Sequence, residues 1–458
     1  MPISPARRIA FEVLCRVASQ GAYASELLHT RLNDRISRAD AALSTELTLG
    51  ILRWQRLLDF LLERNLARPA ERLDLEVLIA LRLGLYQLRF LERVPAHAAV
   101  DQSVELVKRA QKYSAAGLVN AVLRRASADA KVSGKALLAL LPASASFAER
   151  CGILHSHPTW LVERWIARYG KDRCIMLLEA NNRPARLSCA VADAESVATV
   201  EQSLREGGFE SLPGRWLRTT LALSGGNLTS AEAFRQGKIT LQDEASQMVA
   251  HLVDARPGQI ALDLCSAPGG KTLILARTVG AGGMVIAADL YDHRLRSVQE
   301  QLARTGAGNV TLLALDATAP LPFQAKFSRI LVDAPCSGTG TLARNPEIRW
   351  RLDPQDLANA HMRQTAMLRQ ALALLAPGGR LVYATCSLEA EENEEVVRDA
   401  LSGDLQVHVA PGAADALLPH LRQGVPADSL FDRDGFFRTF PPESGTDGFF
   451  AAALERVI

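Results

Sequence analysis

The stretch Ala261-Leu-Asp-Leu-Cys-Ser-Ala-Pro-Gly-Gly-Lys-Thr272 begins as an apolar run, stops at an acid and turns through two glycines into a helical pattern. We interpret it as a strand, a tight turn and the start of a helix. Glycines at such a turn let the backbone approach a ligand closely, and the new helix offers unpaired N–H groups to an anionic or carboxylate-bearing group. The stretch therefore predicts a cofactor loop, with a ligand-free glycine turn as the alternative.

The spacing of the glycines separates this loop from two familiar nucleotide-binding loops. A P-loop requires glycine at position 265, where Cys265 stands, and the dinucleotide pattern G-x-G-x-x-G is missing. Nucleotide hydrolysis and hydride transfer are therefore disfavoured. The next apolar run ends at Asp289, nineteen residues after Gly270, which is about the distance at which an acid reaches ribose hydroxyls in doubly wound folds.

Around this loop, apolar runs alternate with helical patterns. We predict strands at 259–264, 284–289, 310–315, 328–333 and 379–384, followed by an antiparallel closing pair at 436–440 and 448–454. Such alternation is typical of a mostly parallel, doubly wound α/β sheet. A helix is predicted to lead into it from Gln242, with Asp243 and Glu244 in the first turn, where negative charge suits the helix dipole.

The rest of the chain differs in pattern. Apolar residues at three- and four-residue spacing run from Pro5 to about Ala128, which predicts an all-α bundle of about seven helices with caps such as Ser37 and Ser114. A small α+β module follows, with two helices after Pro158, strands at 186–191, 216–223 and 238–241, and a helix at 195–206. We therefore expect a helical domain at 1–130, a linker with a short helix at 131–157, the module at 158–241 and the α/β domain at 242–458.

Length, charge and cysteine content indicate how many domains to expect and in which compartment the protein works. With 458 residues the chain is long enough for two or three cores, and its basic excess lies in residues 1–130, which carry 19 Lys and Arg against 14 Asp and Glu. Seven scattered cysteines without a C-x-x-C pair indicate neither a disulfide framework nor a zinc site. Without an apolar run of membrane length or a signal-peptide pattern, we expect a cytoplasmic protein that contacts no membrane.

Three motifs carry a resemblance to a known family. Asp263-Leu-Cys-Ser-Ala-Pro-Gly-Gly-Lys-Thr272, Asp333-Ala-Pro-Cys-Ser-Gly-Thr-Gly340 and Tyr383-Ala-Thr-Cys-Ser387 together resemble the S-adenosylmethionine-dependent RNA cytosine-5 methyltransferases. The N-terminal part resembles the antitermination factor NusB, and this combination is similar to the bacterial small-subunit (16S) rRNA methyltransferases B of the Sun/Fmu family. The resemblance covers nearly the whole chain and implies a Rossmann-like methyltransferase domain behind a NusB-like RNA-binding domain.

Methylation of cytosine at carbon 5 needs a nucleophile at carbon 6, because the aromatic ring is itself a poor nucleophile. Two thiols follow predicted strands, Cys336 and Cys386, and physical reasoning alone does not rank them. The resemblance implies that Cys386 is the nucleophile and that Cys336 resolves the adduct; small buried thiols are the structural alternative. Asp333 is expected where cofactor and base meet, bonding the ring edge when N3 gains a proton.

The resemblance also implies which residues hold the cofactor. The expected lining of the S-adenosylmethionine pocket consists of Asp263, Cys265, Ser266, Ala267, Pro268, Gly269, Gly270, Lys271, Asp289, Arg294, Asp316 and Asp333. Asp289 is expected on the ribose and Asp316 near the adenine, although an acid that ends a strand also commonly caps the next turn. Ser266 departs from the commoner alanine of the family. No metal is expected.

Two basic regions are candidates for RNA contact. Arg344-Asn-Pro-Glu-Ile-Arg-Trp-Arg351 combines arginines with Trp350, which suits phosphate contact and base stacking, with a solvated loop as the alternative. The family has Asp where Glu347 stands, which leaves a direct role of that carboxylate open. In the helical domain the candidates are Arg7, Arg8, Arg53, Arg56, Lys108, Arg109, Arg124 and Arg125.

The sequence thus predicts a monomeric 16S rRNA cytosine-5 methyltransferase. The same reaction on tRNA is the alternative within enzymes, which the catalytic motifs permit and the NusB-like part disfavours. A catalytically idle RNA-binding assembly factor is the alternative from another class, and the presence of both Cys336 and Cys386 disfavours it.

Overall fold

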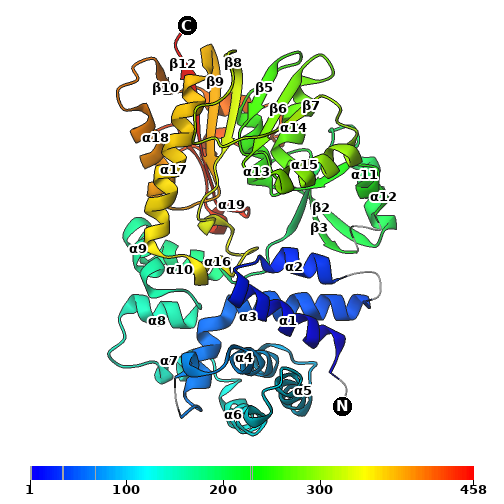
Figure 1. Cartoon of the computed structure of the whole chain (residues 1–458), viewed down its shortest axis with the longest axis vertical. Helices are drawn as coiled ribbons and strands as arrows, with labels where there is room; N and C mark the ends of the chain where they lie inside the picture. Colours follow the sequence, from blue (N-terminus) through cyan, green and yellow to red (C-terminus); the bar gives the residue numbers. More distant parts are fainter. Residues whose placement is uncertain (1–2, 33–35, 68, 227, 229–230) are drawn as a thin grey trace. The chain divides into compact units, whose positions relative to one another are not determined.

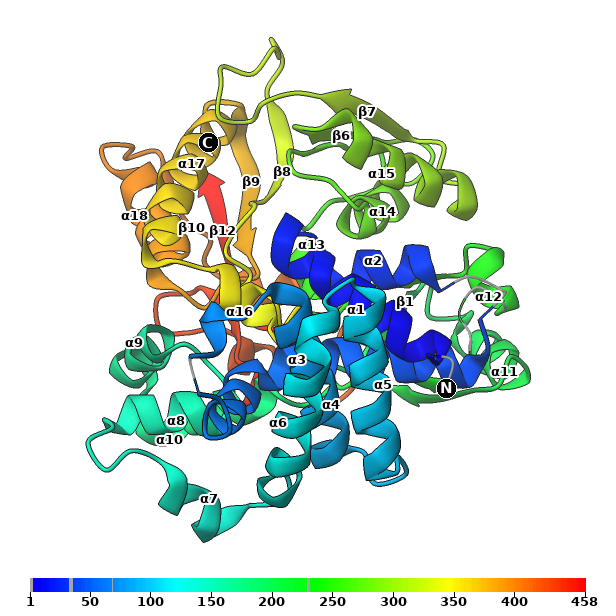
Figure 2. The ribbon, with the colours of Figure 1, turned by 60° about the horizontal axis from the view of Figure 1, so that its bottom comes forward.

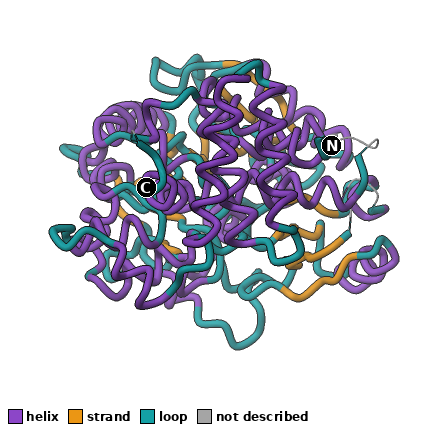
Figure 3. The backbone as a smooth tube through the Cα atoms, turned by 90° about the horizontal axis from the view of Figure 1, so that it is seen from below, coloured by secondary structure: helices purple, strands orange, loops and turns teal. Residues whose placement is uncertain are grey.

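The computed structural model describes residues 3–32, 36–67, 69–226, 228 and 231–458. The chain divides into two compact units, of which unit 1 comprises residues 1–184 and 342–351 and unit 2 comprises 185–341 and 352–458. Every described strand lies in unit 2, so the strands of Figure 3 all belong to that unit. No described helix combines the length and apolar character that a membrane span needs.

Unit 1 is all-α, and the helical part predicted for residues 1–130 lies within it (Figure 2). Its helices are α1 (Pro5–Gln20), α2 (Ala24–Arg31), α3 (Arg38–Glu63), α4 (Leu75–Phe90), α5 (Ala96–Arg109), α6 (Ala116–Asp129), α7 (Gly134–Leu140), α8 (Phe147–Leu154), α9 (Thr159–Tyr169), α10 (Lys171–Asn181) and α16 (Ile348–Arg351), with short 3₁₀ turns at Ala70–Arg72 and Tyr113–Ala115. The expected linker at 131–157 therefore contains two helices, α7 and α8.

The core of unit 1 follows from the helical spacing of its apolar residues. On α3, Leu47, Ile51, Leu58 and Leu62 are at most 1% exposed, because three- and four-residue steps place them on one face. Ser37 caps α3 as predicted, since its hydroxyl accepts from the Asp40 N–H. The cap expected at Ser114 is wrong, because Ser114 lies inside the 3₁₀ turn that precedes α6.

Unit 2 begins with a four-stranded antiparallel sheet in the order β2-β3-β1-β4. Its elements are β1 (Leu187–Val191), α11 (Val197–Glu206), β2 (Phe209–Pro213), β3 (Thr220–Gly225), α12 (Glu232–Arg235) and β4 (Ile239–Leu241). The prediction missed β2, whose residues alternate poorly in polarity, and began β3 four residues early. Leu217 instead forms an isolated bridge to Leu421 in the same unit.

The larger sheet of unit 2 has the order β10-β12-β9-β8-β5-β6-β7, with β11 paired to β12. Its strands are β5 (Ile260–Asp263), β6 (Met284–Asp289), β7 (Val310–Ala314), β8 (Phe327–Asp333), β9 (Leu375–Thr385), β10 (Val407–Val409), β11 (Phe437–Thr439) and β12 (Phe449–Arg456). The strands β5 to β9 are mutually parallel, and β10, β11 and β12 pair antiparallel. The predicted closing pair is therefore confirmed, whereas the three-residue edge strand β10 was missed.

Helices cover both faces of this sheet, because successive strand residues point to opposite sides. One face packs Ala261, Leu331 and Val382 against α13 (Glu244–Leu252) and α14 (Gly270–Val279). The other packs Leu262 and Ile330 against α17 (Pro354–Ala373) and α18 (Glu394–Leu401). Figure 1 shows α17 and α18 beside β8 and β9, and α14 with α15 (Asp292–Thr305) beside β6 and β7.

Short elements complete unit 2. They are the 3₁₀ turns Thr339–Thr341, Ala390–Glu392, Ala413–Ala416 and Ala427–Leu430, and the helix α19 (Pro441–Ser444). The parallel strands run in the order third, second, first, fourth, fifth, and the order reverses between β5 and β8. In doubly wound sheets a ligand binds outside the carboxyl ends of the strands at this reversal.

Candidate active site

The two cysteines expected to carry the chemistry lie in contact. Strands β8 and β9 are parallel neighbours, with Asp333 opposite Ala384, so the loops that follow them leave the sheet side by side. The sulfur atoms of Cys336 and Cys386 lie 3.4 Å apart. Their shared hydrogen bond, together with burial, raises the pKa of Cys336 well above its ordinary value. Cys336 therefore remains a protonated thiol near neutral pH.

An ion pair joins the glycine turn to the end of β8. Lys271, in the first turn of α14, places its Nζ 2.7 Å from Oδ2 of Asp333 and 5.1 Å from the centre of the Phe449 ring. The side chain of Lys271 is 10% exposed and that of Asp333 is 27% exposed. A group bound at this strand end thus meets one fixed positive and one fixed negative charge beside the two thiols.

The two glycines of the turn lie against side chains of the protein itself. Gly269 has a φ of +105°, and a Cβ built there lies 3.2 Å from Val298 Cγ1; a Cβ at Gly270 lies 3.1 Å from the Gln242 carboxamide carbon. The missing side chains therefore make room for the protein's own residues. The N-terminus of α14 still presents N–H groups that have no partner within the helix.

The strand that leads into the turn carries buried polar atoms suited to a ligand. Asp263 is 1% exposed, and its Oδ2 accepts a 2.7 Å bond from the Thr272 hydroxyl. Burial raises the pKa of Asp263 to about 7. Among the described residues, its Oδ1 and the hydroxyl of Ser266 find no hydrogen-bond partner. Buried polar atoms are normally satisfied, so this loop fits a polar cofactor that supplies donors and acceptors.

Asp289 ends β6 beside the turn and is 3% exposed. Its carboxylate accepts from the N–H of Ala267 and of Tyr291, both at 3.3 Å, and lies 3.4 Å from the Arg294 guanidinium. Arg294 also reaches the carbonyl of Ala267 at 3.5 Å. These contacts are long, and hydrogen bonds of such length are weak. The carboxylate therefore retains capacity to accept stronger bonds.

Other expected pocket residues have structural contacts of their own. Asp316 is exposed and accepts from the Thr318 N–H at 2.8 Å and from its hydroxyl at 2.7 Å, which lowers the pKa of Asp316 and gives it the capping contact considered as the alternative. The Pro268 carbonyl accepts from the Gln301 amide at 2.7 Å. Burial raises the pKa of Cys265 well above its ordinary value, so this thiol is not ionised near neutral pH.

Residues 342–351, which we call the strap, form part of unit 1. Arg349 is fully buried; its guanidinium donates to the carbonyls of Ser156 and Asn181, both at 3.1 Å, and to the Asn182 side chain at 2.8 Å. Burial lowers the pKa of Arg349 to about 9. The indole of Trp350 donates to the Leu52 carbonyl at 2.7 Å.

The alternative of a solvated loop is therefore wrong, because Glu347 and Arg349 are buried and bonded inside unit 1. Arg349 is also removed from the candidate RNA contacts, while Arg344, Trp350 and Arg351 are half-buried. Arg351 donates to the Gly21 carbonyl at 2.6 Å, and the Glu347 carboxylate, 1% exposed, accepts from the Ala24 N–H at 2.8 Å. Burial raises the pKa of Glu347. These partners lie some 300 residues away in sequence, so no local pattern could reveal them.

The basic residues of the helical domain that were expected to face RNA divide into three groups. Arg53 is 5% exposed and donates to the Ala343 carbonyl, while Arg56 donates to the His157 carbonyl and the Thr159 hydroxyl. These two arginines hold unit 1 together and are removed from the candidate surface. Arg7 and Lys108 are half-buried and bonded to Gln87 and Glu105. The exposed members are Arg8, Arg109, Arg124 and Arg125.

Strand order, glycine turn and strand-end acids define a Rossmann-like methyltransferase domain. Comparison with known families agrees: "16S rRNA methyltransferase RsmB/F" matches residues 250–455, the NusB family matches 4–128, and an RsmF/B-like ferredoxin-like domain matches 157–227. The chain is 31% identical to the probable ribosomal RNA small subunit methyltransferase B of Bacillus subtilis, over 98% of both chains. The chain belongs to the RsmB/F family of 16S rRNA methyltransferases.

Two further relatives support this assignment. The ribosomal RNA small subunit methyltransferase B of Pseudomonas putida is 33% identical, over 98% of both chains. Among solved structures, a methyltransferase homolog protein from Pyrococcus horikoshii is 29% identical with a TM-score of 0.56, and the match covers 69% of this chain and 100% of that one.

Proposed function

We propose that the protein transfers a methyl group from S-adenosylmethionine to carbon 5 of a specific cytosine in small-subunit (16S) rRNA, through a covalent cysteine adduct at carbon 6. The observation that carries this proposal is the pair of thiols 3.4 Å apart at the ends of β8 and β9. One thiol can form the adduct while the other stands next to the bond that must later break. Membership of the RsmB/F family supports rRNA as the substrate.

The first step assigned to this site is addition of Cys386 to the cytosine. Its thiolate forms a bond to carbon 6, and the electron pair of the 5,6 double bond moves so that carbon 5 becomes nucleophilic. We assign this role to Cys386 because it stands in the Tyr383-Ala-Thr-Cys-Ser387 motif, in which the RNA cytosine-5 methyltransferases that the chain resembles carry their nucleophile. Asp333, fixed by Lys271, is suited to hold the ring edge as N3 gains a proton.

When bound, S-adenosylmethionine supplies an electrophilic methyl group, which carbon 5 of the adduct takes up. A base, such as a water molecule, then takes the proton from carbon 5, its electron pair forms the 5,6 double bond again, and the carbon–sulfur bond breaks to return the Cys386 thiolate. We assign assistance in this release to Cys336, which lies in contact with the departing sulfur.

We assign the cofactor to the turn that precedes α14. The unsatisfied Asp263 Oδ1 and Ser266 hydroxyl, and the N–H groups of the α14 N-terminus, offer polar contacts there. Asp289 is assigned to the ribose hydroxyls, with Arg294 beside it. The rest of the turn from Cys265 to Lys271 forms the wall, and Asp316 is assigned to the adenine side with its capping contact intact.

The two cysteines are expected to give opposite mutant phenotypes. Cys386→Ser should neither methylate rRNA nor form an adduct, because a serine hydroxyl without an activating base is hardly ionised near neutral pH. Cys336→Ser should methylate once and remain attached to its RNA. A denaturing gel with labelled 16S rRNA should show a retarded, heat-stable band for Cys336→Ser alone.

Wild-type enzyme on RNA that contains 5-fluorocytosine provides the matched control, since fluorine cannot leave as a proton does and the adduct should persist. A band that follows Cys386→Ser and vanishes with Cys336→Ser would reverse the two roles. Methylation of tRNA transcripts in preference to 16S rRNA, with the same gel pattern, would leave the chemistry in place and overturn the assigned substrate.

A further inference from the structure

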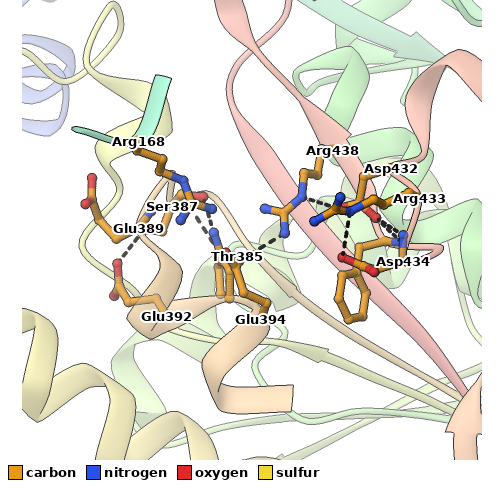
Figure 4. Close-up of polar contacts among 12 residues, drawn as sticks. Arg168, Thr385, Ser387, Glu389, Glu392, Glu394, Asp432, Arg433, Asp434 and Arg438 are labelled. Carbon is orange, nitrogen blue, oxygen red and sulfur yellow. Dashed lines mark hydrogen bonds and ion pairs between the residues drawn. The ribbon is translucent and has the colours of Figure 1, made fainter. Parts of the chain in front are cut away.

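A buried carboxylate connects the two cysteine loops. Glu392 is 0% exposed and accepts a 2.7 Å bond from the N–H of Ser337, and it also accepts from the hydroxyls of Ser337 and Ser387. Ser337 directly follows Cys336, and Ser387 directly follows Cys386. One carboxylate therefore binds the residue after each thiol; Figure 4 shows Ser387 and Glu392 facing one another.

Glu392 also bonds to residues outside the two cysteine loops. Gln364 on α17 donates to its Oε1 at 3.2 Å, and the backbone carbonyl of Glu392 accepts a 2.6 Å bond from the Tyr383 hydroxyl on β9. The next residue, Asn393, donates to the Ser387 carbonyl at 2.9 Å. Glu392 is thus fixed to a helix and a strand of the scaffold, so it can impose a position on the two loops.

Burial of an ionised carboxylate at this position costs folding free energy unless hydrogen bonds satisfy its oxygen atoms. Burial raises the pKa of Glu392, while the bonds from Ser337, Ser387 and Gln364 oppose that shift. All the contacts described for its side chain are with the protein, and none involves Cys336, Cys386 or Asp333. The carboxylate makes no hydrogen bond to either thiol; it contacts the residues that follow them, and its negative charge contributes to the raised pKa of Cys336.

We propose that Glu392 is a positioning residue that holds the Cys336 and Cys386 loops together, so that the two sulfur atoms keep the close contact that adduct formation and release require. Its catalytic consequence rests on the function proposed above. Its geometric consequence does not, because the thiols should lose their contact in the Glu392 variants whether or not the protein methylates RNA.

The geometric consequence can be measured on the full-length protein without RNA or cofactor. Diamide oxidises two neighbouring thiols to a disulfide and takes up both protons and both electrons, and peptide mass mapping identifies the Cys336–Cys386 pair. We expect Glu392→Ala to slow this reaction by roughly tenfold, because positioned groups react much faster than free ones. Glu392→Gln should lose less, since its amide keeps one acceptor and can donate to the serine hydroxyls. Glu395→Gln is the matched control, with a half-exposed carboxylate 4.0 Å from Arg398.

Methylation provides the second measurement. In single-turnover reactions on 16S rRNA, Glu392→Ala should lower the rate of adduct formation while leaving the S-adenosylmethionine dissociation constant unchanged. If Glu392→Ala does not fold, Ser387→Ala removes one of the bonds to the carboxylate and should slow disulfide formation by a smaller factor.

An unchanged or faster Cys336–Cys386 oxidation rate in Glu392→Ala and Ser387→Ala would overturn the positioning role. A wild-type protein that oxidises rapidly but methylates no RNA would instead overturn the proposed function and leave the role of Glu392 in place.

Discussion

At the scale of single residues, Asp263 makes the stability of the cofactor-free protein depend on pH. Burial raises the pKa of Asp263 in the folded protein from its ordinary value of 3.8 to about 7. An unfolded chain ionises Asp263 before the folded one does, so stability falls as pH rises from about 4 and the loss is complete above about 7. Between pH 5 and pH 8 this amounts to about 3 kcal/mol.

Asp263→Asn should remove this pH-dependent contribution to the free energy of unfolding. We expect the urea midpoint of wild-type protein to fall more steeply between pH 5 and pH 8 than that of the variant, both measured at full length without cofactor. The Asp243 carboxylate is a suitable control, because it caps α13 at the helix start and Asp243→Asn keeps an acceptor there. Parallel pH profiles for wild type and Asp263→Asn would contradict the prediction.

Asp289 is the residue on which the proposed cofactor site depends most directly. Asp289→Ala should weaken S-adenosylmethionine binding by about 1.5 to 3 kcal/mol if the carboxylate makes charged hydrogen bonds to the ribose. Calorimetric titration measures this loss, and Asp289→Asn, which keeps one acceptor for the Ala267 N–H, should lose less. An unchanged dissociation constant in Asp289→Ala would mean that the ribose binds elsewhere.

The role of a residue could be predicted from the sequence where its chemistry requires a recognisable local motif. It could not be predicted where the role depends on a partner far away in the sequence. Cys336 and Cys386 each stand in a short motif at a strand end, and the parallel sheet brought them together as expected. Glu244 was expected only to suit a helix dipole, yet its buried carboxylate accepts from the N–H groups of Arg215, Trp216 and Leu217. Glu392 lies in a run of acids, and nothing local distinguishes it from Glu391 or Glu395.

At the scale of elements, the strap depends on Arg349. Arg349→Ala should leave the Ser156 and Asn181 carbonyls without this donor inside unit 1 and create a cavity. We expect a loss of about 3 kcal/mol or more in unfolding free energy. Arg351→Ala should cost less, because its acceptors lie near the surface at the end of α1.

Tryptophan fluorescence during urea unfolding can measure this loss, because four of the five tryptophans, at positions 54, 160, 165 and 350, lie in unit 1. Equal destabilisation by Arg349→Ala and Arg351→Ala would argue against a central role of Arg349.

Long helices and strands with a regular apolar pattern could be predicted from the sequence, whereas short or irregular elements could not. The long parallel strands and the helices of unit 1 have strong apolar patterns, and they were found with small errors at their ends. The edge strand β10 has three residues, and the pattern of β2 is broken by polar residues and Pro213, so neither gave a usable signal. The strap has no apolar periodicity, and its buried side chains bond to partners far away in the sequence.

At the scale of the whole molecule, the exposed basic residues of unit 1 should contribute RNA affinity through phosphate contacts. Replacing Arg8 and Arg124 with glutamine should lower the slope of log affinity against log salt by about 1.5 to 2, since each phosphate contact releases counterions. Filter binding to 16S rRNA between about 50 and 300 mM salt, a roughly sixfold range, measures the slope. Arg296→Gln with Arg398→Gln, two exposed arginines of unit 2 that face Asp292 and Glu395, is the control. The same change in both double variants would show general charge attraction without a dedicated surface.

The strap also determines when unit 1 can be completed during synthesis. The chain leaves unit 1 after residue 184 and returns to it only at residue 342. A ribosome that adds about 5 to 20 residues per second therefore needs roughly 10 to 30 s between the end of the first segment and the emergence of Arg351. During that interval the acceptors that Arg349 will bind have no guanidinium to bind them. The helical part of a nascent chain is therefore completed only after four of the eight strands of the larger sheet, β5 to β8, have been translated.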